Sequence, residues 1–199
     1  MKYLKFFDEI EKIIVHDELC KFLGVNEDGV LEFSYADIVK SAGHSCGTVS
    51  GAYLISLEGL KELYSNEELP ERGMIKVELK KTEEEENTGV VGFVLSNITG
   101  ATTNYGFGGS PTGKFNRRGT LIYGSNIKQD VVLTNIKTGE KVGIDYKPQR
   151  IVKPMEILMS AIKENATKED IESFPKRFQD MVKHIFDNKE KVIDIVKFN

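Results

Sequence analysis

The sequence has no tryptophan, only two cysteines and five prolines in 199 residues, and no apolar run long enough to cross a membrane. Cys20 and Cys46 are too few for a disulfide framework, and a zinc ribbon built from paired CxxC motifs is excluded. The first residues carry acidic side chains where a signal peptide needs an uninterrupted apolar stretch. We therefore expect a cytoplasmic protein with no membrane partner.

A surplus of basic residues is also lacking. The 27 lysines and arginines are outnumbered by 31 aspartates and glutamates, which gives a formal net charge of -4. A protein that wraps phosphate backbones needs clustered basic residues, so we expect no nucleic-acid partner. With 40% hydrophobic residues the chain has a globular composition, and its length favours one domain over residues 1–199.

The spacing of apolar residues predicts helices in the first third of the chain. Residues 4–23 carry apolar side chains at helical spacing, and Gly24 is placed to end such a helix, so we expect an N-terminal helix within residues 1–24. A capping-box pattern predicts a short helix over residues 34–40. Residues 47–64 predict a longer helix with one apolar face.

The middle of the chain predicts strands. Residues 75–79 alternate between apolar and charged side chains, and the continuous apolar run 90–98 is typical of a central strand. Further strands are predicted at 120–123, 131–136 and 141–146, the last two joined by a hairpin turn. The expected fold class is α+β, with an antiparallel or mixed sheet packed with helices around a core at about residues 35–147.

After Pro148 the pattern returns to helix. We expect a C-terminal helical extension over residues 154–199, with a cap at Thr167 and a division at Pro175. This extension could pack on the sheet or on a second subunit.

The strongest chemical signal is the segment Gly43-His44-Ser45-Cys46 at the start of the long predicted helix. A histidine nitrogen and a cysteine sulfur two residues apart suit zinc, nickel, iron or copper. Two ligands do not complete a site, because a catalytic metal needs at least one more protein ligand and an open position. We expect His16 or an oxygen ligand to be the third, since His184 is more simply a residue near a helix C-terminus.

The same two residues allow other interpretations. A histidine and a cysteine near a helix start often serve only as a cap and a small core residue. Cys46 would also feel the positive end of the helix dipole, which makes it a candidate nucleophile or redox thiol. Cys20 is not placed to act as its resolving partner, because it lies on a predicted helix where burial is expected. Metal binding therefore ranks ahead of thiol chemistry.

A second polar segment, rich in glycine and threonine, spans residues 99–109. Its spacing matches neither a P-loop nor a dinucleotide fingerprint, so a flexible loop is the simpler interpretation. Arg117 and Arg118 could clamp a carboxylate or phosphate, although exposed arginines are more often simply solvated. With Thr102 they form a candidate wall for a small anionic ligand.

Two residues before the Gly43 motif are candidates for the same small-molecule site. Tyr35 and Asp37 carry oxygen atoms that could bind a ligand or assist proton transfer.

These motifs, in their order, resemble the FmdE family, which is associated with formylmethanofuran dehydrogenase and in which a G-H-x-C segment opens a helix and a T-G-C-T segment follows later. The counterparts are Gly43-His44-Ser45-Cys46 and Thr99-Gly100-Ala101-Thr102, and the resemblance covers residues 35–147. It implies an α+β fold, a homodimer and a metal such as zinc near His44 and Cys46. Ala101 stands where the family often has a cysteine, which removes a third thiolate. The cysteine-rich C-terminal finger of some members is also missing.

The leading hypothesis is therefore an FmdE-like homodimer that binds a transition metal ion, zinc before nickel or iron, and holds a small anionic ligand. If it is an enzyme, a metal with an open position would polarise an oxygen or activate water. The resemblance does not by itself supply a reaction. The alternatives are a carrier of a metal-containing organic cofactor such as haem, and a structural protein whose site has decayed.

Overall fold

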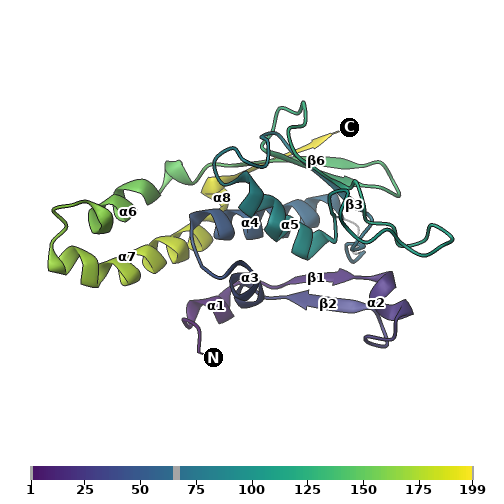
Figure 1. Ribbon diagram of the computed structural model, residues 1–199, viewed down its shortest axis with the longest axis horizontal. Coiled ribbons are helices and arrows are strands. Elements are labelled where there is room, and N and C mark those ends of the chain that lie inside the picture. Colours follow the sequence, from purple (N-terminus) through teal and green to yellow (C-terminus); the bar gives the residue numbers. More distant parts are fainter. Residues whose placement is uncertain (1, 65–67, 199) are drawn as a thin grey trace.

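The computed structural model describes residues 2–64 and 68–198, and it has three layers with a helix pair in the middle (Figure 1). The upper layer is a mixed sheet with the strand order β4-β3-β5-β6-β7, in which only β3 and β4 are parallel. Its strands are β3 (Ile75–Leu79), β4 (Leu121–Ile122), β5 (Val131–Asn135), β6 (Lys141–Tyr146) and β7 (Ile193–Phe198). The fold class is α+β, as predicted.

The middle layer is formed by α4 (Gly47–Leu63) and α5 (Thr88–Thr99), which pack against each other under the sheet. Glycines let α4 approach the strands closely. A Cβ atom at Gly59 would lie 2.9 Å from Cδ1 of Leu133, and one at Gly51 would overlap the ring of Tyr146. Because α4 is covered on several sides, it is buried along most of its length.

The lower layer is an antiparallel pair of strands with short helices at its ends. It contains α1 (Phe6–Glu9), β1 (Ile13–His16), α2 (Glu18–Phe22), β2 (Val30–Phe33) and α3 (Tyr35–Ala42). The expectation of one opening helix was wrong. Ile13 and Val15 alternate with exposed neighbours and enter the core, so the pairing of β1 with β2 overrides the helical spacing.

The apolar run 90–98 was also wrongly predicted, because it lies in α5 and not in a strand. A continuous apolar run fits a buried helix as well as a buried strand. Gly100 follows this helix with φ +72°, which ends it in the left-handed conformation that favours glycine.

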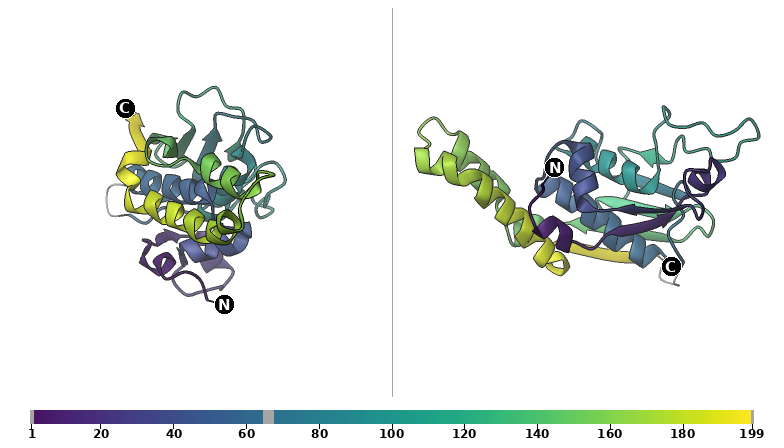
Figure 2. Two further views of the ribbon diagram at one scale, coloured as in Figure 1. Left: turned by 90° about the vertical axis from the view of Figure 1, so that its left-hand side faces the viewer. Right: turned by 90° about the horizontal axis from the view of Figure 1, so that it is seen from below.

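The C-terminal part projects from the body as a helical hairpin and then returns to the sheet (Figures 1 and 2). It contains the 3-10 helix η1 (Pro148–Arg150), α6 (Pro154–Ile162), α7 (Lys168–Asp187) and α8 (Lys189–Val192), followed by β7. Two expectations fail here. Pro175 lies inside α7 and does not divide it, and the last described residues pair with β6 as a strand. Met1 and Asn199, the outer ends of the expected terminal helices, lie outside the described residues.

The remaining local predictions are confirmed. Ser34 and Asp37 form a capping box at α3, Thr167 and Asp170 form one at α7, and the predicted strands at 75–79, 131–136 and 141–146 are present. None of the helices in the described part of the chain is long and apolar enough to cross a membrane.

Candidate functional site

Cys46 lies immediately before α4 and acts as its N-cap. Its sulfur accepts a hydrogen bond from the backbone N–H of Val49 at 3.5 Å. The thiol is half-buried, so it faces both the helix start and the solvent. A sulfur at this place feels the positive end of a 17-residue helix.

A small polar network supports the segment from below. The hydroxyl groups of Tyr35 and Ser45 are 2.9 Å apart, and Ser45 Oγ donates to Gln179 Oε1 at 2.9 Å. Gln179 in turn donates through Nε2 to the carbonyl of Ser45 at 3.0 Å. Burial raises the pKa of Tyr35 well above its usual value, so its hydroxyl stays protonated near neutral pH. Tyr35 therefore positions Ser45 and is poorly suited to proton transfer.

His44 is exposed beside this network. Its Nδ1 lies 3.0 Å from the carbonyl oxygen of Ala42, the residue at the end of α3. Asp37, the other predicted oxygen ligand near this segment, is the acidic partner of the α3 capping box, and its carboxylate accepts from the backbone and hydroxyl of Ser34.

His16 is separated from His44 and Cys46. Its ring Nδ1 lies 2.7 Å from Oε2 of Glu71, and its backbone N–H donates to Pro70, in the segment that follows α4. Cys46 precedes α4, whose 17 residues span about 25 Å. Across residues 2–64 and 68–198 the structure contains no group of three or more His, Cys, Asp or Glu side chains arranged to hold a metal ion.

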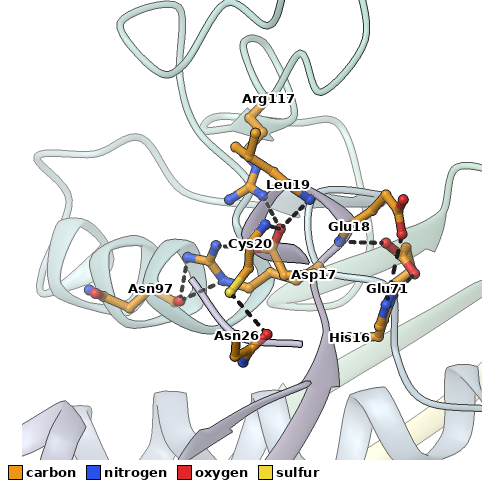
Figure 3. Close-up of polar contacts among 10 residues, drawn as sticks. His16, Asp17, Glu18, Leu19, Cys20, Asn26, Glu71, Asn97 and Arg117 are labelled. Atoms are coloured by element: carbon orange, nitrogen blue, oxygen red, sulfur yellow. Dashed lines mark hydrogen bonds and ion pairs between the residues drawn. The ribbon is translucent and has the colours of Figure 1, made fainter. Parts of the chain in front are cut away.

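A second polar cluster, defined by Asp17, Arg72 and Arg117, lies beside His16 (Figure 3). Asp17 is 2% exposed and accepts from Arg117 Nη2 at 2.6 Å and from Arg72 Nη1 at 2.7 Å. It also accepts from two backbone N–H groups in the first turn of α2 as its N-cap. Burial acts to raise the pKa of Asp17, but the hydrogen bonds from both guanidinium groups outweigh it and hold the pKa below its usual value.

The Asp17 cluster joins three distant segments of the chain. Arg72 also donates from Nε and Nη2 to the carbonyl of Asn97 near the end of α5. Thr102, which precedes the long loop, donates its hydroxyl to the carbonyl of Arg117 at 2.6 Å. These bonds fix the N-terminal strands, α5 and the Gly-rich segment to one another.

The predicted anion wall is therefore divided. Arg117 is almost buried against Asp17, whereas Arg118 is exposed and donates from Nε to the carbonyl of Gly106 at 2.6 Å. The structure brings Thr102 and Arg117 together, but it places them beyond the end of α5, away from His44 and Cys46.

Sequence reasoning missed two members of these clusters. Gln179 lies 134 residues from Ser45, and no local pattern in α7 indicates that its amide turns toward that residue. Arg72 lies in a short segment without periodicity, so its role between Asp17 and Asn97 leaves no signal in the sequence.

The molecule is thus an α+β protein whose predicted site residues fall into two polar clusters. No protein-family model matches the chain, and no curated protein matches it. Among solved structures, it is similar to the crystal structure of a tungsten formylmethanofuran dehydrogenase FmdE-like protein from Syntrophus aciditrophicus, with a TM-score of 0.47 and 13% identity. The similarity covers 84% of this chain and 73% of that chain. At these values it assigns neither a family nor a function.

Proposed function

We propose that this chain is a metal-binding protein in which His44 and Cys46 ligate a transition metal ion in front of α4. Zinc is the first choice and nickel or iron are the alternatives, because these ions accept both imidazole and thiolate ligands. The proposal is supported by the accessibility of both side chains and by their hydrogen bonds.

The observation that carries the proposal is the contact between His44 and Ala42. A carbonyl oxygen only accepts hydrogen bonds, so the 3.0 Å contact places the hydrogen on Nδ1 and leaves the lone pair on Nε2. Metal-binding histidines are commonly oriented in this way, with the second ring nitrogen bonded to a carbonyl or carboxylate. His44 is exposed, so its Nε2 is available to an ion.

Cys46 would supply the sulfur. A metal-bound cysteine is a thiolate, and negative charge at this sulfur is stabilised by the N–H of Val49 and by the positive end of the α4 dipole. The Tyr35–Ser45–Gln179 network holds the backbone between the two ligands, which keeps their spacing fixed.

Two protein ligands leave at least two positions of a tetrahedral site to be filled. We propose a homodimer whose second copy supplies one further ligand, and a small anionic ligand or water in the last position. His16 is left out of this set because its ring is bound to Glu71 beyond the other end of α4. A metal with such an open position can polarise a bound oxygen or activate water.

Elemental analysis of anaerobically purified protein tests the proposal. We expect near-stoichiometric metal in the wild type and a loss of metal in the His44→Ala/Cys46→Ala double variant. His16→Ala is the matched control, because it removes an imidazole of the other cluster and is expected to keep the metal.

Three outcomes decide against parts of the proposal. Metal-free wild-type protein with a normal circular dichroism spectrum would overturn the metal site. A visible haem band in freshly purified protein would instead favour a carrier of a metal-containing organic cofactor. Sedimentation of the fully metal-loaded protein as a monomer would overturn the shared site while leaving His44 and Cys46 as ligands.

A further inference from the structure

A cleft of about 460 Å³ opens beside the first turn of α4, where it meets the start of α5 and the ends of β3 and β6. This volume lies in the range of cavities that hold small organic molecules, roughly 300–1,000 Å³. Its apolar lining comes from Ile55, Leu79 and Val91, and its polar lining includes Thr48 and Lys80. The cleft thus offers both an apolar surface and polar groups from separate segments.

The charged side chains of the lining are three lysines and two carboxylates, which leave one net positive charge in a chain of net charge -4. They are Lys80, Lys81, Lys147, Glu86 and Asp130.

Most of these groups already have partners. Lys81 pairs with Glu86 at 2.6 Å, and Lys147 is held by Asp194 at 2.8 Å and by Asp145 at 3.3 Å, neither of which lines the cleft.

Lys80 is the cation of the lining that remains without a carboxylate partner within the described part of the chain. Its Nζ donates only to the carbonyl of Lys128 at 3.1 Å. Asp130 is the carboxylate without a cation partner, and its Oδ2 accepts the backbone N–H of Tyr146 at 3.1 Å. Lys80 can therefore take up an acid group, while Asp130 disfavours a ligand with several negative charges.

The first turn of α4 adds to the positive character of the cleft. The N–H groups of Gly47 and Thr48 have no acceptor among the residues that the structure describes. Thr48 lines the cleft, and its hydroxyl accepts from Asn87 of the α5 N-cap at 3.3 Å.

The cleft also adjoins the His44–Cys46 segment. Tyr146, which lines the cleft, donates its hydroxyl to the carbonyl of Gly47 at 2.8 Å, and Gly47 directly follows Cys46. The ring of Tyr146 packs against Gly51 one turn further along α4. A ligand in the cleft would therefore lie next to the helix turn that Cys46 caps.

We propose that this cleft binds a small organic anion, a carboxylate or phosphate ester with an apolar body. The acid group is held by Lys80 with the first turn of α4 nearby, and the apolar body lies on Ile55, Leu79 and Val91. This extends the proposed function, since it gives the anionic ligand a place beside the metal site, but the cleft does not need the metal to bind.

Titration of the full chain with phenyl phosphate, followed by nitrogen–proton NMR, tests the proposal. We expect saturable shifts at the amides of Thr48, Lys80 and Val91, both in the wild type and in the His44→Ala/Cys46→Ala variant. Lys80→Gln should weaken binding about tenfold, because it removes one charged hydrogen-bond donor while keeping a similar chain. Lys137→Gln, in the exposed turn between β5 and β6, should change it less than about twofold.

Several results would overturn the proposal. Equal weakening by Lys80→Gln and Lys137→Gln would show general attraction of an anion to lysines. Inorganic phosphate that binds as tightly as phenyl phosphate would remove the apolar part, and benzyl alcohol that binds equally well would remove the anionic part. Binding that is lost in the His44→Ala/Cys46→Ala variant, while that variant stays folded, would assign the anion to the metal and not to the cleft.

Discussion

Asp17 is the most strongly constrained charged residue in the described part of the chain, because one buried carboxylate holds two arginines and caps a helix. We predict that Asp17→Asn lowers the free energy of unfolding by about 3 kcal/mol, since removing one partner leaves buried guanidinium groups uncompensated. Urea denaturation measures this change. Asp187→Asn is the matched control, because it breaks an exposed pair with Lys183 and should change stability by less than about 1 kcal/mol.

The same residue predicts a pH dependence. The pKa of Asp17 is lower in the folded protein than its usual value, so its stabilising contribution is present above about pH 4 and is lost as the pH falls through the folded pKa. We therefore expect the stability difference between wild type and Asp17→Asn to be largest near neutral pH and to shrink toward acid. A difference that stays constant from about pH 7 to about pH 3 would contradict the role of the charge.

Gly51 and Gly47 form a test of packing on one helix. A Cβ at Gly51 would overlap the Tyr146 ring, whereas one at Gly47 would lie 3.8 Å from Ile185 and Pro154. We predict that Gly51→Ala destabilises by about 1–3 kcal/mol through overpacking. Gly47→Ala should stay within about 0.5 kcal/mol of the wild type in the same denaturation experiment. Equal effects of the two substitutions would mean that helix propensity, and not contact with Tyr146, governs both.

At the scale of elements, the sequence predicts well where local chemistry decides the structure. The capping boxes that begin α3 and α7 and the hairpin between β5 and β6 are set by neighbouring residues, and all of them are present. The failures lie where tertiary packing decides. Residues 90–98 form α5 because they are enclosed on several sides, and a fully apolar segment carries no periodicity that separates helix from strand.

The cap of α7 is the element-scale prediction. Thr167 accepts from the N–H of Asp170, and the Asp170 carboxylate accepts from Thr167 in return. Thr167→Ala should destabilise the start of α7 by about 1 kcal/mol. Because the α6–α7 hairpin projects from the body, we expect faster hydrogen exchange at the amides of the first turn of α7 and little change in the sheet.

Lys168→Ala is the control for this cap, since Lys168 is the next residue, is exposed and has only a 3.7 Å pair with Glu172. It should leave exchange in the first turn of α7 nearly unchanged. Faster exchange throughout the sheet of the Thr167→Ala protein would mean that the hairpin and the body unfold together.

At the scale of the whole molecule, the candidate site could be predicted only in part. His44 and Cys46 are close in the sequence and are found together before α4, as expected. His16, Thr102 and Arg117 lie beyond the other end of the central helix pair, and this separation depends on how the layers stack. The sequence contains no signal for the length that a helix places between two motifs until the helix and its partners are known.

The separation of core and metal site leads to the last prediction. Buried residues between the two sheets form one continuous core, and neither His44 nor Cys46 is among its fully buried members. Unlike a zinc finger, the protein should therefore fold without metal. Zinc at about 100-fold over its Kd should add about 2.7 kcal/mol of stability and raise Tm by roughly 5–10 °C in scanning calorimetry. The His44→Ala/Cys46→Ala variant should show no such rise and His16→Ala should show all of it, whereas a chelated wild type that is unfolded at room temperature would mean that the metal site belongs to the core.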